Sequence, residues 1–280
     1  MSTVLITGAM RGIGRATALR LAATGWEVHA GVRRLEEGES LAAEAPAGAI
    51  VPLLLDVTNA AHVEALESVL PAHLDAVVNN AGIVLDGPIE AIVPDDLRHQ
   101  LDVNVVGQVA VTQAVLPRIR ESRGRIVFIS SVSGRISTPW TGAYNASKFA
   151  LEGLADALRI ELRPWGIKVI IVEPSSTDTD LWRTALEQLD RTEAALSAEH
   201  RRLYARHVVG MRRTTKLIQK QAVPVANVVA TVEHALTDPR PRARYPVGAV
   251  SKIQLAMGAA TPTRVMDAAL ARLTGVPRKP

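Results

Sequence analysis

Seven short runs rich in Val, Ile and Leu recur along the chain, and longer segments with apolar residues at helical spacing separate them. The runs are "VLIT" (4–7), "EVHAGV" (27–32), "IVPLLL" (50–55), "DAVVN" (75–79), "RIVFIS" (125–130), "IKVIIV" (167–172) and, as the last candidate, "RARYPVG" (242–248). Continuous apolar strands that alternate with helices are typical of a parallel sheet covered on both faces. The pattern predicts an α/β fold with a doubly wound, seven-stranded, mostly parallel sheet.

Two of the segments between the strands carry clear helix signals. "GIGRATALRLAATG" (12–25) has apolar residues at helical spacing and ends at Gly25, while "TNAAHVEALESVL" (58–70) opens with a Thr/Asn cap. We find no Pro/Gly/Ser-rich linker, fixed-period repeat or low-complexity tract that would divide the chain. A single domain over residues 1–280 is therefore expected.

Residues 181–222, after the sixth strand, form a long amphipathic stretch of helical character. Between Arg201 and Lys220 it carries several cations and no acid. A charge run of this kind is usually a solvated helix face. A segment inserted after a late strand also lies near the carboxyl edge of the sheet, where ligands bind. Two interpretations stay open: a solvated face, or a helical lid over a substrate cleft.

Composition excludes several classes of protein. Apolar residues make up 48% and charged residues 21% of the 280 residues, as in ordinary globular proteins. The chain has no cysteine, so disulfides, thiolate metal sites and cysteine nucleophiles are excluded. The histidines show no metal-ligand spacing, and no metal is expected. A net charge of +4 with only 3% aromatic residues does not predict a nucleic-acid partner.

The position of the apolar runs also bears on location. The first run starts almost at the initiator Met, which leaves no room for the charged and apolar regions of a signal peptide. No uninterrupted apolar run reaches the roughly 18 residues of a membrane-spanning helix. We therefore expect a cytoplasmic protein without an integral membrane segment.

A glycine-rich turn follows directly after the first strand. "TGAMRGIG" (7–14) places Gly8, Gly12 and Gly14 in a T-G-x-x-x-G-x-G spacing. Glycines at such a turn let the backbone approach a pyrophosphate that sits on the N-terminus of the next helix. The position between a strand and an amphipathic helix favours a dinucleotide site over a plain strand-to-helix turn.

A second candidate stretch, "YNASK" (144–148), places a tyrosine and a lysine four residues apart. Residues at this spacing share one face of a helix, so Tyr144 and Lys148 should point toward a common place. An ammonium near a phenol stabilises the phenolate and lowers the tyrosine pKa from its usual value of about 10. The pair is a candidate for proton transfer, although the spacing alone also occurs by chance.

Taken in order, these motifs resemble the short-chain dehydrogenase/reductase family in its compact single-domain branch, over nearly the whole chain. The further matching pieces are "LDVT" (55–58), "NNAG" (79–82), "NVVG" (104–107), "ISSVSG" (129–134) and "EPSSTDT" (173–179). The interval from Ser131 to Tyr144 matches the family as well. The resemblance implies a Rossmann fold and an NAD(P)-dependent oxidoreductase that interconverts a secondary alcohol and a ketone.

The same resemblance implies a role for each catalytic candidate. Tyr144 would be the general acid/base, and Lys148 would lower its pKa and hold the nicotinamide ribose. Ser131 would bind the substrate oxygen, and the interval to Tyr144 selects it over the neighbouring serines. Asn104 would anchor a water that relays protons from Lys148 to solvent.

The family pattern also implies the cofactor contacts. Besides Tyr144 and Lys148 these are Gly8, Arg11, Gly12, Ile13, Gly14, Arg33, Asp56, Val57, Asn80, Ala81, Pro174, Thr177 and Thr179. The family usually has glycine after Pro174, whereas this chain has Ser175. If the backbone there needs a positive φ, serine costs about 1 kcal/mol, and the positions of the two threonines depend on that loop.

The end of the second strand bears on cofactor choice. An acid at this point binds the ribose 2′-hydroxyl of NAD and repels the 2′-phosphate of NADP. Val32 occupies that position, Arg33 follows it, and Arg11 lies in the glycine-rich turn. Two guanidiniums are thus available for a phosphate, and we predict NADP(H) as the preferred cofactor. NAD(H) stays possible if Arg33 only begins a solvated loop and one of the next glutamates binds the hydroxyl.

Substrate and partners are predicted from the resemblance alone. "YNASKFALEGL" and "RARYPVG" look like the hydroxysteroid and retinol dehydrogenase members, which implies a small-molecule alcohol or ketone with a bulky apolar body. Residues 84–95, 135–142 and 181–222 should determine which substrate is bound. The apolar stripe after Tyr144 should pack against a second subunit in a homodimer or homotetramer. The alternative function is a non-catalytic nicotinamide-dinucleotide sensor, which needs the glycines but no proton-transfer set.

Overall fold

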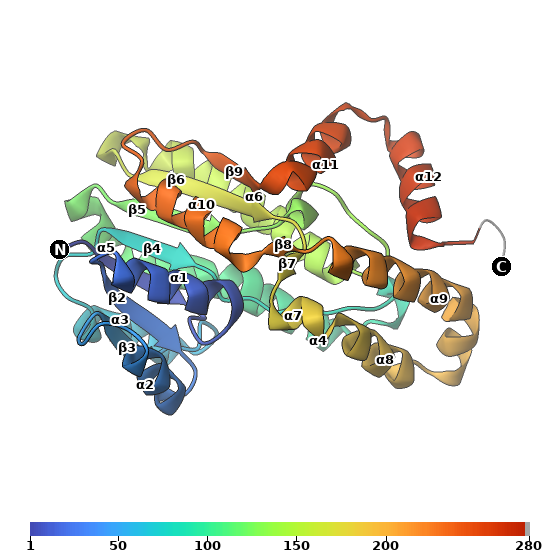
Figure 1. The fold of residues 1–280 in the computed structure, drawn as a ribbon, viewed down its shortest axis with the longest axis horizontal. Coiled ribbons are helices and arrows are strands. Elements are labelled where there is room, and N and C mark those ends of the chain that lie inside the picture. Colours follow the sequence, from blue (N-terminus) through green and yellow to red (C-terminus); the bar gives the residue numbers. More distant parts are fainter. Residues whose placement is uncertain (278–280) are drawn as a thin grey trace.

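All seven predicted strands form in the computed structural model, which describes residues 1–277. They are β1 (Thr3–Thr7), β2 (Glu27–Val32), β3 (Ile50–Leu54), β4 (Ala76–Asn79), β5 (Arg125–Ile129), β6 (Lys168–Pro174) and β9 (Arg244–Val247). Every neighbouring pair is parallel, in the order β3-β2-β1-β4-β5-β6-β9 (Figure 1). The strand order reverses between β1 and β4, and ligands bind at such a reversal in open α/β sheets.

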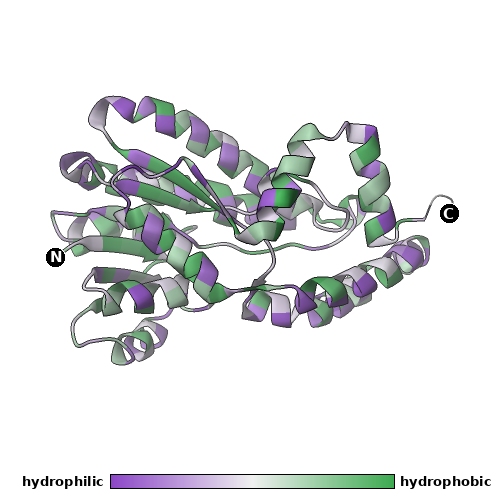
Figure 2. Cartoon of the chain, turned by 45° about the horizontal axis from the view of Figure 1, so that its top comes forward, coloured by the Kyte–Doolittle hydropathy of each residue, from purple (hydrophilic) through white to green (hydrophobic). Residues whose placement is uncertain are grey.

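Helices cover both faces of the sheet, as predicted. One face packs against α1 (Gly12–Ala23), α2 (Leu35–Ala43) and α10 (Val225–Thr237), and the other against α3 (Ala60–Val69), α5 (Gly107–Ser122) and α6 (Gly142–Glu161). Successive strand residues point to opposite faces, so Val4 and Ile6 enter the first core and Leu5 the second. Figure 2 shows largely hydrophobic strands, whereas both kinds of residue alternate around the outer helices.

Short helical segments complete the sheet edge. They are η1 (Ile89–Ala91), α4 (Pro94–Leu101), the π-helical η2 (Asp102–Val106), η3 (Val132–Gly134) and η4 (Arg163–Trp165). The predicted Thr/Asn cap of α3 is Asn59, whose side chain accepts hydrogen bonds from the backbone of Ala61 and His62. The predicted stop of α1 is also confirmed, since the helix ends two residues before Gly25, which has a φ of 88°.

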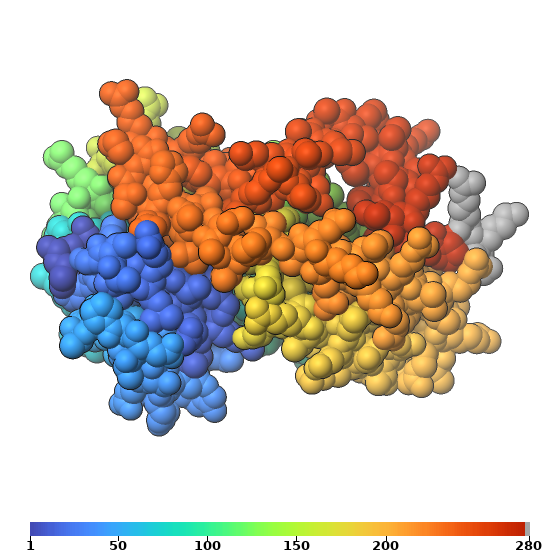
Figure 3. Space-filling view, viewed as in Figure 1, coloured from blue at the N-terminus to red at the C-terminus, as the bar shows by residue number. Residues whose placement is uncertain are grey.

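Residues 181–222 are helical, as expected. The segment holds α8 (Ala185–Ala195) and α9 (Ala198–Lys220), preceded by the short α7 (Asp180–Arg183). The strands β7 (Thr177–Asp178) and β8 (Val223–Pro224) flank this segment in the sequence and pair with each other. The helical segment therefore begins and ends at the same place, the β7–β8 neck. Figure 1 shows α8 and α9 projecting beyond the carboxyl ends of the strands, and in Figure 3 the same residues, yellow to orange, protrude from the body of the molecule.

The C-terminal helices α11 (Gly248–Ala260) and α12 (Thr263–Thr274) lie beyond the same edge (Figure 1). The end of α12 packs on α9, where the Thr214 hydroxyl donates to the Leu273 carbonyl oxygen at 2.8 Å and Gly210 lies against Gly275. Between residues 1 and 277, no helix is both long and apolar enough to cross a bilayer.

Candidate active site

The glycine-rich turn after β1 has the shape that a pyrophosphate site needs. Gly8 and Gly12 have φ values of 64° and 57°, which side-chain-bearing residues rarely adopt. A Cβ at Gly8 would lie 2.9 Å from the Cα of Ala81, and one at Gly14 would collide with the Asn80 amide. The turn therefore packs directly on the segment after β4, and the backbone at the start of α1 is left open to a ligand.

The NNAG segment holds this turn in place. The Asn80 side-chain amide donates to the carbonyl oxygens of Thr7 at 2.9 Å and Gly8 at 3.1 Å. The backbone N–H groups of Asn80 and Ala81 donate to the Thr7 hydroxyl at 3.0 and 2.9 Å. The side chain of Asn80 thus stabilises the conformation of the glycine-rich turn. From the sequence alone, this role could not be told apart from a direct contact with the cofactor.

Two arginines border the far end of the same crevice. Arg11 and Arg33 are both exposed, and neither makes an ion pair within the described residues. Arg33 lies close enough to Asp56 to influence it electrostatically. Burial opposes ionisation of Asp56, but hydrogen bonds from Thr58 and the charge of Arg33 hold its pKa below the usual value. The crevice therefore presents an ionised carboxylate near the exposed Arg33 guanidinium.

Ser131, Tyr144 and the loop after β6 meet at the carboxyl ends of β5 and β6. Ser131 hydrogen-bonds Tyr144, and its hydroxyl lies 3.4 Å from the Pro174 carbonyl oxygen. The backbone N–H of Ser133 donates to the Ser131 hydroxyl at 3.1 Å, which fixes the serine at the start of η3. The hydroxyl of Ser130, in contrast, is buried without a hydrogen-bond partner. Of these three serines, the one selected by its interval to Tyr144 is the one that contacts it.

Tyr144 and Lys148 share one face of α6, as their spacing predicts. The Lys148 ammonium lies 5.8 Å from the centroid of the Tyr144 ring and donates to the Ile129 carbonyl oxygen at 2.8 Å. Burial lowers the pKa of Lys148 to about 8, against the opposing charge of Glu152. The lysine is thus a buried ammonium held between the end of β5 and the tyrosine.

The expected lowering of the Tyr144 pKa is wrong for this geometry. Burial raises the pKa of Tyr144 to about 12, although the hydrogen bond from Ser131 acts in the opposite direction. The negative charge of Asp86 raises it further. Removal of the phenol from water outweighs the other influences, so Tyr144 is held in its protonated form at neutral pH.

Asn104 lies in the π-helical turn η2. Its side chain accepts from the Ile83 backbone N–H at 2.8 Å and donates to the Ile83 carbonyl oxygen at 2.9 Å and the Ser147 hydroxyl at 3.0 Å. The side chain is completely buried. The hydrogen bonds of Asn104 therefore join the segment after NNAG to α6.

The loop after β6 does not carry the strain that Ser175 suggested. Ser175 has no positive φ, so serine costs nothing there relative to glycine. The Thr177 hydroxyl donates to the Ser175 carbonyl oxygen at 3.0 Å. Thr179 lies over the glycine-rich turn, since a Cβ at Gly12 would be 3.5 Å from its methyl group. Of the two threonines, Thr179 is therefore the one that lies against the glycine-rich turn.

Two predicted contacts are mainly structural. Val57 is buried in the second core, and Ile13 packs partly buried against the first. They shape the crevice, and any direct cofactor contact from them has to come from their backbone.

The sequence did not single out Asp86 and Trp140, which also lie at this site. Trp140 is buried with a φ of 75°, and its carbonyl oxygen accepts from the Gly87 backbone N–H at 2.7 Å. Its ring meets that of Tyr204 on α9 at a centroid distance of 6.4 Å, and the two join the apolar cluster of Leu189 and neighbouring side chains. Both residues fall in segments expected to determine the substrate, but no spacing distinguishes them.

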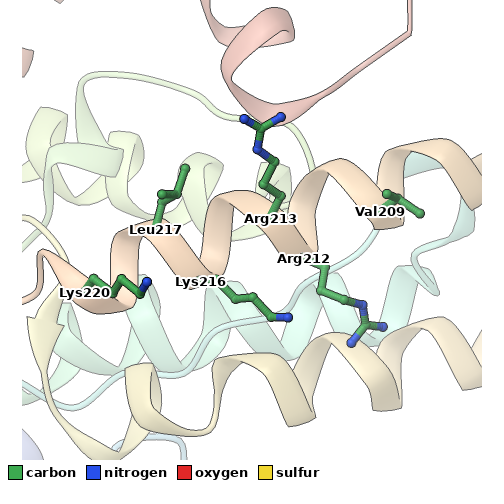
Figure 4. A pocket seen from close by; sticks show the side chains of 6 residues that line it. All are labelled: Val209, Arg212, Arg213, Lys216, Leu217 and Lys220. Carbon is green, nitrogen blue, oxygen red and sulfur yellow. The ribbon is translucent and has the colours of Figure 1, made fainter.

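The basic residues of α9 point in different directions. A groove of about 350 Å³ runs along Val209, Arg212, Arg213, Lys216, Leu217 and Lys220 (Figure 4). Arg212 and Lys216 point to the opposite side of the helix from Arg213 and Leu217. Arg212 pairs with Asp190 at 2.6 Å and Glu193 at 3.2 Å, which binds α9 to α8. Part of the basic stretch therefore stabilises the helical pair itself.

A parallel sheet with a glycine-rich turn after β1 and a Ser–Tyr–Lys cluster at its carboxyl edge defines a nicotinamide-type oxidoreductase of the Rossmann class. The chain belongs to the short-chain dehydrogenase family, whose sequence model, described as short chain dehydrogenase, matches residues 2–190. The predicted family is thereby confirmed.

Similarity to individual members extends over most of the chain. Retinol dehydrogenase 5 of Mus musculus is 34% identical over 283 residues, covering 95% of this chain and 87% of that protein. The 17-beta-hydroxysteroid dehydrogenase type 1 of Homo sapiens is 36% identical over 258 residues, covering 87% and 76%. The structure of a short chain dehydrogenase from Burkholderia cenocepacia J2315 in complex with NADP superposes with a TM-score of 0.74 at 26% identity and covers 97% of both chains. The expected likeness to hydroxysteroid and retinol dehydrogenases is confirmed.

Proposed function

We propose that the protein is an NADP(H)-dependent oxidoreductase that interconverts a ketone and a secondary alcohol on a bulky apolar small molecule. The contact between Ser131 and Tyr144, with Lys148 beside the tyrosine ring, is the observation that carries the proposal. A sensor of nicotinamide redox state would need the glycine-rich turn but no proton donor beside it.

In the proposed reaction, each protein group has one task. A nicotinamide held at the glycine-rich turn and Lys148 would supply the hydride for the carbonyl carbon. Tyr144 donates its phenolic proton to the carbonyl oxygen, and Ser131 hydrogen-bonds the same oxygen, so that a neutral alcohol leaves. Lys148 places a positive charge next to the phenolate that forms. With a pKa of about 12, Tyr144 carries its proton at neutral pH, which is the form that ketone reduction requires.

The preference for NADP(H) rests on the two free arginines at the end of the crevice. Arg33 and Arg11 are exposed and unpaired in the described part of the chain, so both are available for a 2′-phosphate. The nearby Glu37, an alternative partner for a 2′-hydroxyl, is engaged in an ion pair with Arg34. The relative solved with NADP is consistent with this choice.

The helical pair α8–α9 is proposed to act as a lid over the substrate. It starts and ends at the β7–β8 neck, and Trp140 joins it to the loop that leads into Tyr144. On α6, Phe149 and Leu154 are 44% and 43% exposed, and we assign them to contact with a second copy of the chain in a homodimer or homotetramer. A cytoplasmic location remains part of the proposal.

Replacement of Tyr144 by phenylalanine tests the reaction. Tyr144→Phe keeps the ring and removes the proton donor, so turnover of ketones with NADPH should fall by a factor of roughly 10² to 10⁴ while NADPH affinity stays the same. Tyr245→Phe is the matched control, because it removes a hydroxyl that only accepts from the Arg242 backbone at 2.9 Å. Near wild-type turnover by Tyr144→Phe would rule out the mechanism. Cofactor binding with no turnover of any ketone by the wild-type protein would favour the sensor.

A further inference from the structure

The segment between NNAG and η1 is held rigidly against the catalytic helix. The Gln100 side chain accepts from the Leu85 backbone N–H at 2.6 Å, and the Gly87 backbone N–H donates to the Trp140 carbonyl oxygen at 2.7 Å. Downstream, Ile89 fills the space beside Gly142, at the start of α6. Asp86 lies between Leu85 and Gly87, whose backbone N–H groups make these two hydrogen bonds, so its backbone position is fixed. The second bond joins the segment to Trp140, in the loop that leads to Tyr144.

The carboxylate of Asp86 has no partner. Within residues 1–277 it takes part in no hydrogen bond and no ion pair, although the residue is only partly exposed. Glu90, the other acid of this segment, is by contrast hydrogen-bonded to Tyr204 on α9. A partly buried carboxylate without a donor is costly, because it loses water and gains nothing in exchange.

The location of Asp86 relates it to the reaction. It is close enough to Tyr144 for its charge to act on the phenol, and burial raises its own pKa to about 6. A negative charge at this distance raises the pKa of the phenol and makes Tyr144 a weaker proton donor, so it does not assist the reduction of a neutral ketone. A positive charge on the substrate would both satisfy the carboxylate and offset its effect on the tyrosine.

We propose that Asp86 binds a positively charged group of the substrate, and that the substrate class is an amino ketone or amino alcohol with its cationic nitrogen a few bonds from the reacting carbon. The inference rests on the proposed function and narrows it: the apolar body of the molecule lies under α8–α9, and the ammonium lies against Asp86. Ion pairing would orient the carbonyl toward Ser131 and Tyr144.

Two ketones of equal shape provide the test. N,N-dimethyl-4-oxopiperidinium carries a permanent positive charge, and 4,4-dimethylcyclohexanone is its neutral isostere, so the ratio of their kcat/KM values with NADPH isolates the effect of charge. The wild-type enzyme should prefer the cation at pH 7.5. Asp86→Asn should lower kcat/KM for the cation by roughly ten- to a hundredfold. It should not lower kcat/KM for the neutral ketone, because the charge that weakens Tyr144 as a proton donor is removed. Asp96→Asn removes the same charge from an exposed position on α4 and should leave the ratio unchanged.

The possible outcomes separate the inference from the function on which it rests. No preference for the cation in the wild type, or an equal loss for both ketones in Asp86→Asn, would overturn the role of Asp86 while leaving the oxidoreductase reaction in place. A shift of the ratio in Asp96→Asn would assign the preference to overall charge. If the wild type reduced neither ketone, the proposed reaction would fail. Calorimetric titration of the cation into the wild type and Asp86→Asn would then still decide whether Asp86 binds it.

Discussion

A buried carboxylate behind the active site, Glu173, should make the stability of this enzyme depend on pH. The side chain lies at the end of β6 and is 1% exposed. Its Oε1 atom has no hydrogen bond and lies 3.6 Å from the Arg135 guanidinium and 3.8 Å from that of Arg244. Burial, reinforced by the charge of Glu152, raises the pKa of Glu173 from 4.5 to about 7 despite the two arginines.

The size of the effect follows from this difference in pKa. The unfolded chain loses the Glu173 proton near pH 4.5 and the folded chain near pH 7, so between these values the unfolded state binds fewer protons and stability falls as pH rises. At about 1.4 kcal/mol per pKa unit, the free energy of unfolding should decrease by about 3 kcal/mol across this window. Glu173→Gln mimics the protonated side chain and should lack this decrease.

Urea unfolding of wild type and Glu173→Gln at pH 5 and pH 8 measures the effect, because the difference between the two proteins cancels every other titrating group. At pH 5 their free energies of unfolding should agree within about 1 kcal/mol, and at pH 8 the variant should be the more stable by about 2–3 kcal/mol. Glu121→Gln, an exposed change on α5, should show no such dependence. Equal pH dependence in wild type and Glu173→Gln would refute the reasoning.

Three further results are expected at the active site. Lys148→Ala should lower both turnover and NADPH affinity, and an unchanged affinity in a fluorescence titration would exclude the ribose contact. Arg33→Ala should weaken NADPH binding by roughly ten- to a hundredfold with little change for NADH, while Arg34→Ala, whose guanidinium pairs with Glu37, should affect neither. Equal losses for both cofactors would show that Arg33 does not bind the phosphate. Hydrogen exchange in residues 181–222 should slow when cofactor and a substrate analogue bind, and equal rates in both states would contradict a lid.

The catalytic cluster shows which contacts can be predicted from the spacing of residues along the chain. Tyr144 and Lys148 share a face because they belong to one helix, and that relation is fixed by the helical repeat alone. Ser131 reaches them from another element, so only its interval in a resembling family predicted the contact. The pKa of Tyr144 went the other way from the prediction, because burial depends on all the neighbouring elements and sequence spacing does not report it.

The sequence by itself determined the strands, the helices between them and the glycine-rich turn, because each is set by residues close together in the chain: apolar runs, caps, and a turn that needs positive φ. It also determined the family, through motifs in a fixed order. Only the tertiary structure decided which polar groups have hydrogen-bond partners. The side-chain amides of Asn80 and Asn104 hydrogen-bond backbone groups of other segments. The backbone at Ser175 is unstrained. The carboxylates of Asp86 and Glu173 have no hydrogen bond within the described residues. Hydrogen bonding and burial join residues distant in sequence, so these properties exist only once the chain has folded.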